Sequence, residues 1–282
     1  MISVSMLPAY LYCKRKLFIE QVLGIREEPK EETVKGRIRH KIFEEMALRE
    51  QNIILAVTDK HNVEDVAKLY SSAFGEILRN TLICFKYALK SVNLRALDLF
   101  KEIWPMLLEE SKAKAGILIG LIREYGVYGH ELLTKLPKAE PEHRIESKTL
   151  NLVGVIDRIE FIDNRPVPIE FKTGKMPLDG VWPGHKIQIA AYCLLIEEKF
   201  GSRVAEGYVH YLDYAQKRRI SLNPFLRNEV IEMIGRVRTL LESKHPPELP
   251  ENANKCVSCG LRQICHNEEE LNKALQKTLN TT

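Results

Sequence analysis

Three charged residues, Asp157, Glu170 and Lys172, have the types and the spacing to carry out a metal-assisted hydrolysis. Two carboxylates that converge attract a hard cation such as Mg²⁺ or Mn²⁺. A lysine beside them can orient a metal-bound water or help to deprotonate it, which would equip the set to cleave a phosphodiester bond. An ordinary hairpin with acidic and basic ends gives the same pattern, so the surrounding sequence has to distinguish the two interpretations.

The sequence around these residues predicts a two-stranded hairpin over residues 150–162 and 167–173. The first strand is apolar up to Asp157, a polar turn with a proline follows, and the second strand alternates strictly between polar and apolar residues. Because side chains two apart on a strand share a face, Glu170 and Lys172 project together. Asp157 can reach the same face from the neighbouring strand.

Two predicted helices carry polar side chains that could join this site. A helix that begins near Pro183 has Gln188 and Tyr192 four residues apart and therefore on one face. Both side chains could contact nucleic acid, although a partly buried tyrosine beside a surface glutamine gives the same pattern. Residues 31–48 predict a second helix with His40 facing inward, either as a core histidine or as a nitrogen ligand beside the carboxylates.

Cysteines form the second group of residues with potential chemistry. Cys256, Cys259 and Cys265 lie in a loop-like C-terminal segment, and Cys13 lies near the opposite terminus. Three clustered thiols need a fourth ligand, and Cys13 is the best candidate if the termini meet. Disulfides are disfavoured without a secretory signal, and zinc sites more often show two CxxC pairs, so the pattern favours an iron–sulfur cluster. His266 is an alternative ligand that would favour zinc.

Taken together, these motifs resemble a known family, the RecB-type nucleases of the PD-(D/E)xK superfamily. The motifs that carry the resemblance are His40, Gly154-Val155-Ile156-Asp157, Glu170-Phe171-Lys172 and Gln188-x3-Tyr192. The four cysteines narrow it to the CRISPR-associated iron–sulfur exonucleases, the fourth Cas family, which process DNA fragments for spacer acquisition. The resemblance covers roughly residues 1–48 and 145–270.

The resemblance implies a role for each residue of the hydrolytic motifs. The metal, Mg²⁺ or Mn²⁺, would be held by His40, Asp157, Glu170 and the backbone carbonyl of Phe171. Lys172 would complete the catalytic set that it forms with Asp157 and Glu170. The activity implied is that of a DNA exonuclease, with single-strand endonuclease activity as a further expectation.

The resemblance also implies cofactors and partners. Gln188 and Tyr192 would hold DNA and support the active site. The cysteines Cys13, Cys256, Cys259 and Cys265 would bind an iron–sulfur cluster, [4Fe–4S] in preference to [2Fe–2S]. The implied partners are DNA, as single strands or free ends, and the CRISPR integrase proteins. No membrane partner is expected, and the sequence leaves room for an oligomer.

The middle of the chain departs from compact members of that family. Residues 52–138 carry none of the motifs, and apolar spacings of three and four predict helices over residues 63–89, 94–108 and 113–125. This segment resembles the helical insertion of larger archaeal type I-A relatives.

The expected fold is α/β: a restriction-endonuclease-like mixed sheet flanked by helices, with a helical insertion and a terminal iron–sulfur subdomain. With 282 residues, 45% of them hydrophobic, the chain can bury one substantial core or a core plus a helical subdomain. The predicted segments are the N-terminal helices (1–51), the insertion (52–138), the nuclease core (139–245) and the cysteine-bearing tail (246–282).

Charge and hydropathy are compatible with these expectations. A net charge of +4 permits nucleic-acid binding, and basic residues cluster locally at Lys14 to Lys16 and at Arg37, Arg39 and Lys41. The longest apolar run, residues 115–122, is far shorter than the ~20 residues of a membrane span, so a cytoplasmic location is expected.

Two other functions remain open from the sequence. One is a non-catalytic DNA-binding adaptor of the integration complex, and the other is a RecB-like repair nuclease outside CRISPR. An adaptor has no need of all three residues Asp157, Glu170 and Lys172, so their presence favours an enzyme.

Overall fold

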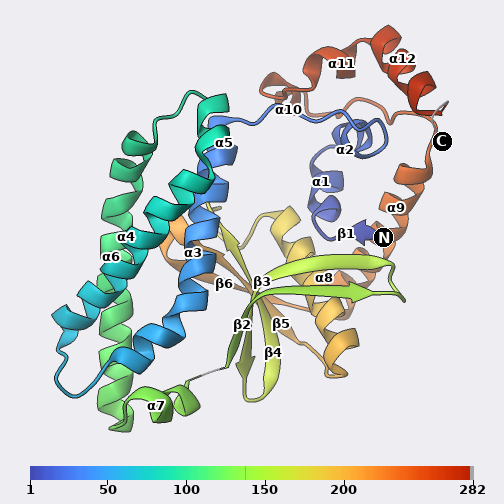
Figure 1. Ribbon diagram of the computed structural model, residues 1–282. Coiled ribbons are helices and arrows are strands. Elements are labelled where there is room, and N and C mark those ends of the chain that lie inside the picture. Colours follow the sequence, from blue (N-terminus) through green and yellow to red (C-terminus); the bar gives the residue numbers. More distant parts are fainter. Residues whose placement is uncertain (137, 280–282) are drawn as a thin grey trace.

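A six-stranded mixed sheet with helices on both faces forms the centre of the protein, as expected from the sequence (Figure 1). The structure, a computed structural model, describes residues 1–136 and 138–279, so residue 137 of the predicted insertion and residues 280–282 of the predicted tail lie outside it. The strands are β1 (Ile2–Ser3), β2 (Ala139–Ser147), β3 (Leu152–Ile162), β4 (Arg165–Lys172), β5 (Glu206–Tyr211) and β6 (Gln216–Ser221).

The helices occupy the rest of the chain. Those before the main strands are α1 (Met6–Tyr12), α2 (Lys14–Gln21), α3 (Glu31–Ala56), α4 (Val63–Cys84), α5 (Lys86–Ser91), α6 (Ala96–Tyr125) and α7 (Gly129–Lys135). The later ones are α8 (Pro183–Phe200), the 3₁₀ turn η1 (Leu212–Tyr214), α9 (Pro224–Glu242), α10 (Asn254–Val257), α11 (Arg262–His266) and α12 (Glu268–Leu279). Among the described residues, no helix has the length and apolar character needed to cross a membrane.

The strand order is β1-β3-β4-β5-β6, with β2 paired to β3 as well. Strands β3 and β4 form the predicted antiparallel hairpin, and β5 lies parallel to β4. The hairpin turn consists of Asp163 and Asn164, whose φ angles of 49° and 60° belong to the left-handed region. Asp and Asn tolerate that conformation, which gives a tight turn the twist that two antiparallel strands require.

Each face of the sheet has its own apolar core. Helices α1, α8 and α9 pack on one face, where Ile156 and Val209 lie among the side chains of α8. Helices α3, α4, α6 and α7 pack on the other face, against Ile169 and Phe171. Figure 1 shows the two groups of helices on opposite sides of the sheet. The helical insertion therefore shares a core with the sheet.

The helix boundaries within the insertion differ from those that its sequence predicts. The single stretch expected over residues 63–89 is divided at Phe85 into α4 and α5. The stretches expected over residues 94–108 and 113–125 are one helix, α6, which runs through Pro105. The apolar period lapses at the polar residues 109–112, but the buried Ser111 hydroxyl donates to the carbonyl of Leu107 at 2.7 Å and stays inside the helix. The helix ends at Gly126, whose φ of 67° suits a glycine cap.

Three strands escape prediction from the sequence. Strand β1 has only two residues, and β2 (AEPEHRIES) is highly polar and contains Pro141. Proline is tolerated there because β2 pairs only with β3 and is an edge strand. Strand β6 lies at the opposite edge, and its charged residues Lys217 and Arg219 pair with Glu160 and Glu206. Edge strands with many charged residues lack the polar–apolar alternation by which a strand is predicted from its sequence.

Glycine at position 154 is required by the packing of α8 on β3. A Cβ atom there would lie 2.8 Å from Tyr192 Cε1 and 3.0 Å from both Leu195 Cδ1 and Val4 Cγ2. We expect Gly154→Ala to lower the free energy of unfolding by about 1–3 kcal/mol, because the added carbon has to displace these side chains. Chemical denaturation measures the change.

Gly235→Ala on the exposed face of α9 is the matched control, since nothing lies within 4 Å of its Cβ position. The same substitution there should stabilise the protein by up to about 1 kcal/mol through helix propensity. Equal unfolding midpoints for Gly154→Ala and the wild type would contradict the packing argument.

Candidate active site and cysteine pocket

Strands β3 and β4 separate at the point where the two acids lie. Their pairing ends at Arg158↔Ile169, so Asp157 and Glu170 are the next positions in the register and face each other beyond the ladder. The N–H of Phe171 donates to Asp157 Oδ2 at 2.6 Å instead of joining the ladder. The separation brings two carboxylates from neighbouring strands to one place, as the sequence predicts.

Glu170 is the most buried acid of this site, with 5% of its surface exposed. Its Oε1 accepts hydrogen bonds from Lys172 Nζ at 2.8 Å and Gln188 Nε2 at 2.6 Å. Its Oε2 is buried and has no hydrogen-bond partner among the described residues. Burial and the Asp157 carboxylate raise the pKa of Glu170 to about 7, while Lys172 opposes the shift.

His40 reaches the acids from α3, on the face of the sheet opposite α8. Its Nε2 lies 2.9 Å from Asp157 Oδ1, and this hydrogen bond raises the pKa of His40. A metal ion would need the lone pair of Nε2, so binding would replace this contact with a metal–nitrogen bond. The structure therefore brings His40, Asp157, Glu170 and Lys172 together, with Phe171 hydrogen-bonded to the aspartate.

Gln188 and Tyr192 lie on α8 and face the gap between the strands. Besides its bond to Glu170, Gln188 Nε2 donates to the Tyr192 hydroxyl at 3.0 Å. That hydroxyl donates to the carbonyl of Val155 at 2.8 Å. Because Gln188 is 6% and Tyr192 4% exposed, contact with DNA would require uncovering them, and their predicted DNA-binding role stays a prediction. In the structure, Gln188 holds the Glu170 carboxylate, and the Tyr192 hydroxyl binds the carbonyl of Val155 beside the gap between β3 and β4.

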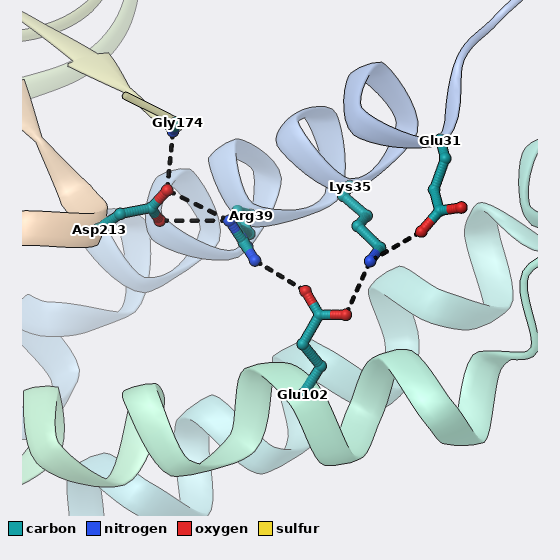
Figure 2. Close-up of polar contacts among 6 residues, drawn as sticks. All are labelled: Glu31, Lys35, Arg39, Glu102, Gly174 and Asp213. Atoms are coloured by element: carbon teal, nitrogen blue, oxygen red, sulfur yellow. Dashed lines mark hydrogen bonds and ion pairs between the residues drawn. The ribbon is translucent and has the colours of Figure 1, made fainter. Parts of the chain in front are cut away.

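A chain of ion pairs that sequence reasoning missed fixes α3 beside the site (Figure 2). Arg39 donates through Nη1 to both oxygens of Asp213, at 3.3 and 3.2 Å, and through Nη2 to Glu102 Oε1 at 2.9 Å. Asp213 Oδ2 also accepts the N–H of Gly174 at 2.7 Å, just past the end of β4. The network links the helix of His40, the insertion helix α6 and the end of the strand that carries Lys172.

Lys35 extends this network by pairing with the second oxygen of Glu102 at 2.8 Å and with Glu31 at 2.9 Å (Figure 2). The sequence marked Arg39 only as part of a basic cluster. Its partners Glu102 and Asp213 are 63 and 174 residues away, and no local pattern indicates such distant contacts.

The four predicted cluster ligands share one pocket between the two chain ends. Cys13, Cys256, Cys259 and Cys265 all line this pocket of about 10 Å³, together with His266. Within residues 1–136 and 138–279, no three His, Cys, Asp or Glu side chains are already arranged to hold a metal ion. The soft thiol donors suit an iron–sulfur cluster, but the sulfur atoms would have to move to reach bonding geometry.

Arg15 joins the two chain ends next to this pocket. It is 4% exposed and donates to the carbonyl of Cys265 through Nε at 3.2 Å and Nη2 at 3.0 Å. Its Nη1 donates to the carbonyl of Pro247 at 2.7 Å, and Nη2 pairs with Glu268 at 2.8 Å. The sequence placed Arg15 in an exposed basic cluster, since nothing local indicates its burial. The termini therefore meet, as the proposed four-cysteine set requires.

Comparison with known proteins gives a consistent family description. Residues 1–266 match the PD-(D/E)XK nuclease superfamily. A CRISPR-associated exonuclease Cas4/endonuclease Cas1 fusion of Leptospira interrogans is 31% identical over 164 residues, which are 55% of this chain and 30% of that protein. A fusion of the same description from Myxococcus xanthus is 32% identical over 138 residues, 46% of this chain and 24% of that protein.

A third relative is named for the exonuclease alone. The CRISPR-associated exonuclease Cas4 of Thermoproteus tenax is 30% identical over 124 residues, 44% of this chain and 64% of that protein. The chain thus spans less than two thirds of the length of each of these relatives. Their names bear out the resemblance to the CRISPR-associated exonucleases that the motifs indicate.

The Tyr192 hydroxyl provides a test of the contacts that close the strand gap. Tyr192→Phe should lower the free energy of unfolding by about 1–3 kcal/mol, because Val155 O and one Gln188 N–H lose their partner. Urea denaturation measures the loss. Tyr87→Phe is the control, since Tyr87 is 76% exposed and its change should stay within about 0.5 kcal/mol. A Tyr192→Phe protein as stable as the wild type would show that the hydroxyl contributes nothing there.

Proposed function

Because the chain belongs to the PD-(D/E)XK nuclease superfamily, we propose that it is a metal-dependent DNA exonuclease that processes DNA fragments for CRISPR spacer acquisition. Single-strand endonuclease activity is a second mode of the same site. The relatives named as CRISPR-associated exonucleases support this setting. The catalytic residues proposed are Asp157, Glu170 and Lys172.

The observation that carries this proposal is the unpartnered Oε2 of Glu170 opposite Asp157. A buried carboxylate oxygen without a hydrogen bond is costly, and a divalent cation between the two acids would stabilise it. Both acids offer the hard oxygen ligands that Mg²⁺ and Mn²⁺ prefer. His40 Nε2, Asp157, Glu170 and the carbonyl of Phe171 would hold the ion.

Lys172 and Gln188 would have separate roles in the proposed hydrolysis. When bound, the metal would supply a Lewis acid for the phosphate and a water of lowered pKa. Lys172, held against Glu170 by a 2.8 Å bond, would orient that water and stabilise the charge that develops on phosphorus-bound oxygen. Gln188 holds Glu170 from the other side and so keeps its free oxygen directed at one place.

The fused relatives support a protein partner. In Leptospira interrogans and Myxococcus xanthus the exonuclease shares a chain with the endonuclease Cas1. The proposed partner of the present chain is an integrase of that kind, which would receive the processed DNA. The proposal places the protein in the cytoplasm, whose reducing conditions keep thiols available for a cluster.

The proposal includes an iron–sulfur cluster, [4Fe–4S] in preference to [2Fe–2S], held by Cys13, Cys256, Cys259 and Cys265. The shared pocket and the nearby Arg15 contacts support it. The role assigned to the cluster is structural, because its ligands lie outside the hydrolytic motifs and join segments more than 240 residues apart in the chain.

The nuclease proposal is tested with end-labelled single- and double-stranded DNA at saturating Mn²⁺. Lys172→Ala should reduce the rate at least about 100-fold, because the water loses its orienting group. Lys175→Ala, an exposed lysine three residues further on, is the matched control and should cleave at the wild-type rate. An unchanged rate for Lys172→Ala would refute its catalytic role, and DNA binding without cleavage by the wild type would favour an adaptor.

The cluster proposal is tested by anaerobic purification. The protein should be brown and contain iron and sulfide, and Cys259→Ser should lose the colour and about 5–10 °C of thermal midpoint. Cys84→Ser, which removes an exposed thiol at the end of α4, should change neither property. Stoichiometric zinc without iron would overturn the iron–sulfur assignment.

A further inference from the structure

An open pocket of about 380 Å³ lies beside the candidate active site and has walls from two different parts of the chain. His40 and Lys172 line it on the side of the hydrolytic residues. Arg37, three residues before His40 on α3, also lines it, and so does Phe85, which connects α4 to α5. The helical insertion therefore contributes an aromatic side chain to the surroundings of the site.

Arg37 is the cation of this pocket that remains available for an anion. Its neighbour Lys41 pairs with Glu44 at 2.5 Å and Glu45 at 3.0 Å, and Lys172 pairs with Glu170. Arg37 is exposed, and no acidic side chain of the described residues forms an ion pair with it. Its guanidinium instead lies 5.3 Å from the centroid of the Phe85 ring.

The junction of α4 and α5 exposes further apolar and basic groups. Ile83 is 65% and Tyr87 76% exposed, and the ammonium of Lys86 lies 4.9 Å from the Tyr87 ring centroid. Aromatic rings interleaved with cations at the surface are the composition of a single-strand nucleic-acid contact, where bases stack and phosphates pair with the charges.

The helices of the insertion are held against α3, the helix that carries Arg37 and His40. Phe43 of α3 packs edge-on against Phe74 of α4, with ring centroids 6.1 Å apart. The ion pairs of Glu102 with Lys35 and Arg39 hold α6 against α3 (Figure 2). Phe85 itself is partly buried and packs against the apolar core that α3 shares with the sheet, so it belongs to a wall of defined position.

We infer that the insertion forms the outer wall of the substrate cleft, where Phe85 stacks on one nucleobase of a DNA strand and Arg37 binds an adjacent phosphate. A base can cover the ring only when it is unpaired, so the bound nucleotide belongs to a single-stranded stretch or a frayed end. This inference rests on the proposed nuclease function and names a substrate-binding contact of the same site.

The test uses single-stranded oligonucleotides in which one abasic position is moved along the chain. KM and kcat are measured in Mn²⁺, and Kd is measured by fluorescence anisotropy in Ca²⁺. Phe85→Leu keeps an apolar side chain and should raise KM and Kd about tenfold with kcat little changed, as expected for the loss of one stacked base. Phe85→Tyr, which keeps a ring, should stay within about twofold of the wild type.

The abasic series separates stacking from a general loss of structure. At one position, an abasic nucleotide should weaken wild-type binding about tenfold and leave Phe85→Leu unaffected, because both changes remove the same contact. Phe225→Leu is the control. It replaces an 85% exposed phenylalanine on α9, a helix that packs on the opposite face of the sheet, and its DNA binding should respond to the abasic positions as the wild type does. Equal thermal midpoints would confirm that the variants are folded.

Two outcomes distinguish failure of this inference from failure of the proposed function. The first outcome is that every abasic substitution weakens DNA binding by Phe85→Leu as much as it weakens binding by the wild type. In that case Phe85 does not stack on a base and the inference is wrong. A wild-type protein that binds but cleaves no DNA would overturn the nuclease proposal, while the anisotropy series would still decide the stacking contact.

Variants of Arg37 test the phosphate contact independently of the stacking contact. Arg37→Ala should lower the slope of log Kd against log salt concentration by about one, because one phosphate contact is lost. Arg37→Lys should keep the slope. An unaltered slope in Arg37→Ala would contradict the phosphate contact.

Discussion

The opening between β3 and β4 is the constraint on which the site depends. Backbone groups that leave a sheet ladder need other partners, and here side chains provide them. Asp157 accepts the N–H of Phe171, and the Tyr192 hydroxyl donates to the carbonyl of Val155. The aspartate proposed as a metal ligand is thus also a structural acceptor, and it is positioned by strands β3 and β4 rather than by a loop.

Local periodicity was sufficient to predict the hairpin, the helices of His40 and Gln188 and the meeting of Asp157 with Glu170. These features follow from side-chain alternation on strands and from spacings of three and four on helices. The ion pairs of Arg39 and the burial of Arg15 were not predictable, because their partners lie far along the chain and surface clusters have the same sequence signature. Strand β2 was not predicted, because its charged residues and its proline are untypical of a strand.

The insertion is integrated with the nuclease sheet more closely than its sequence suggests. Its helices and the strand residues Ile169 and Phe171 belong to one apolar core, and α3 lies between them. Changes within α4 or α6 can therefore act on His40 and on the strand of Glu170 through packing alone. A helical segment without recognisable motifs can in this way influence the active site of a nuclease.

The bonds from Arg15 to the carbonyl of Cys265 connect residues 250 positions apart. During translation, Cys13 and Arg15 emerge before these partners and remain without them until Cys265 and its neighbours have been made. The contacts between Arg15 and Cys265 therefore form late on a nascent chain, and the proposed set of four cysteines is complete only after Cys265 has emerged. Of the four proposed ligands, Cys13 would therefore wait longest for its partners on a ribosome-bound chain.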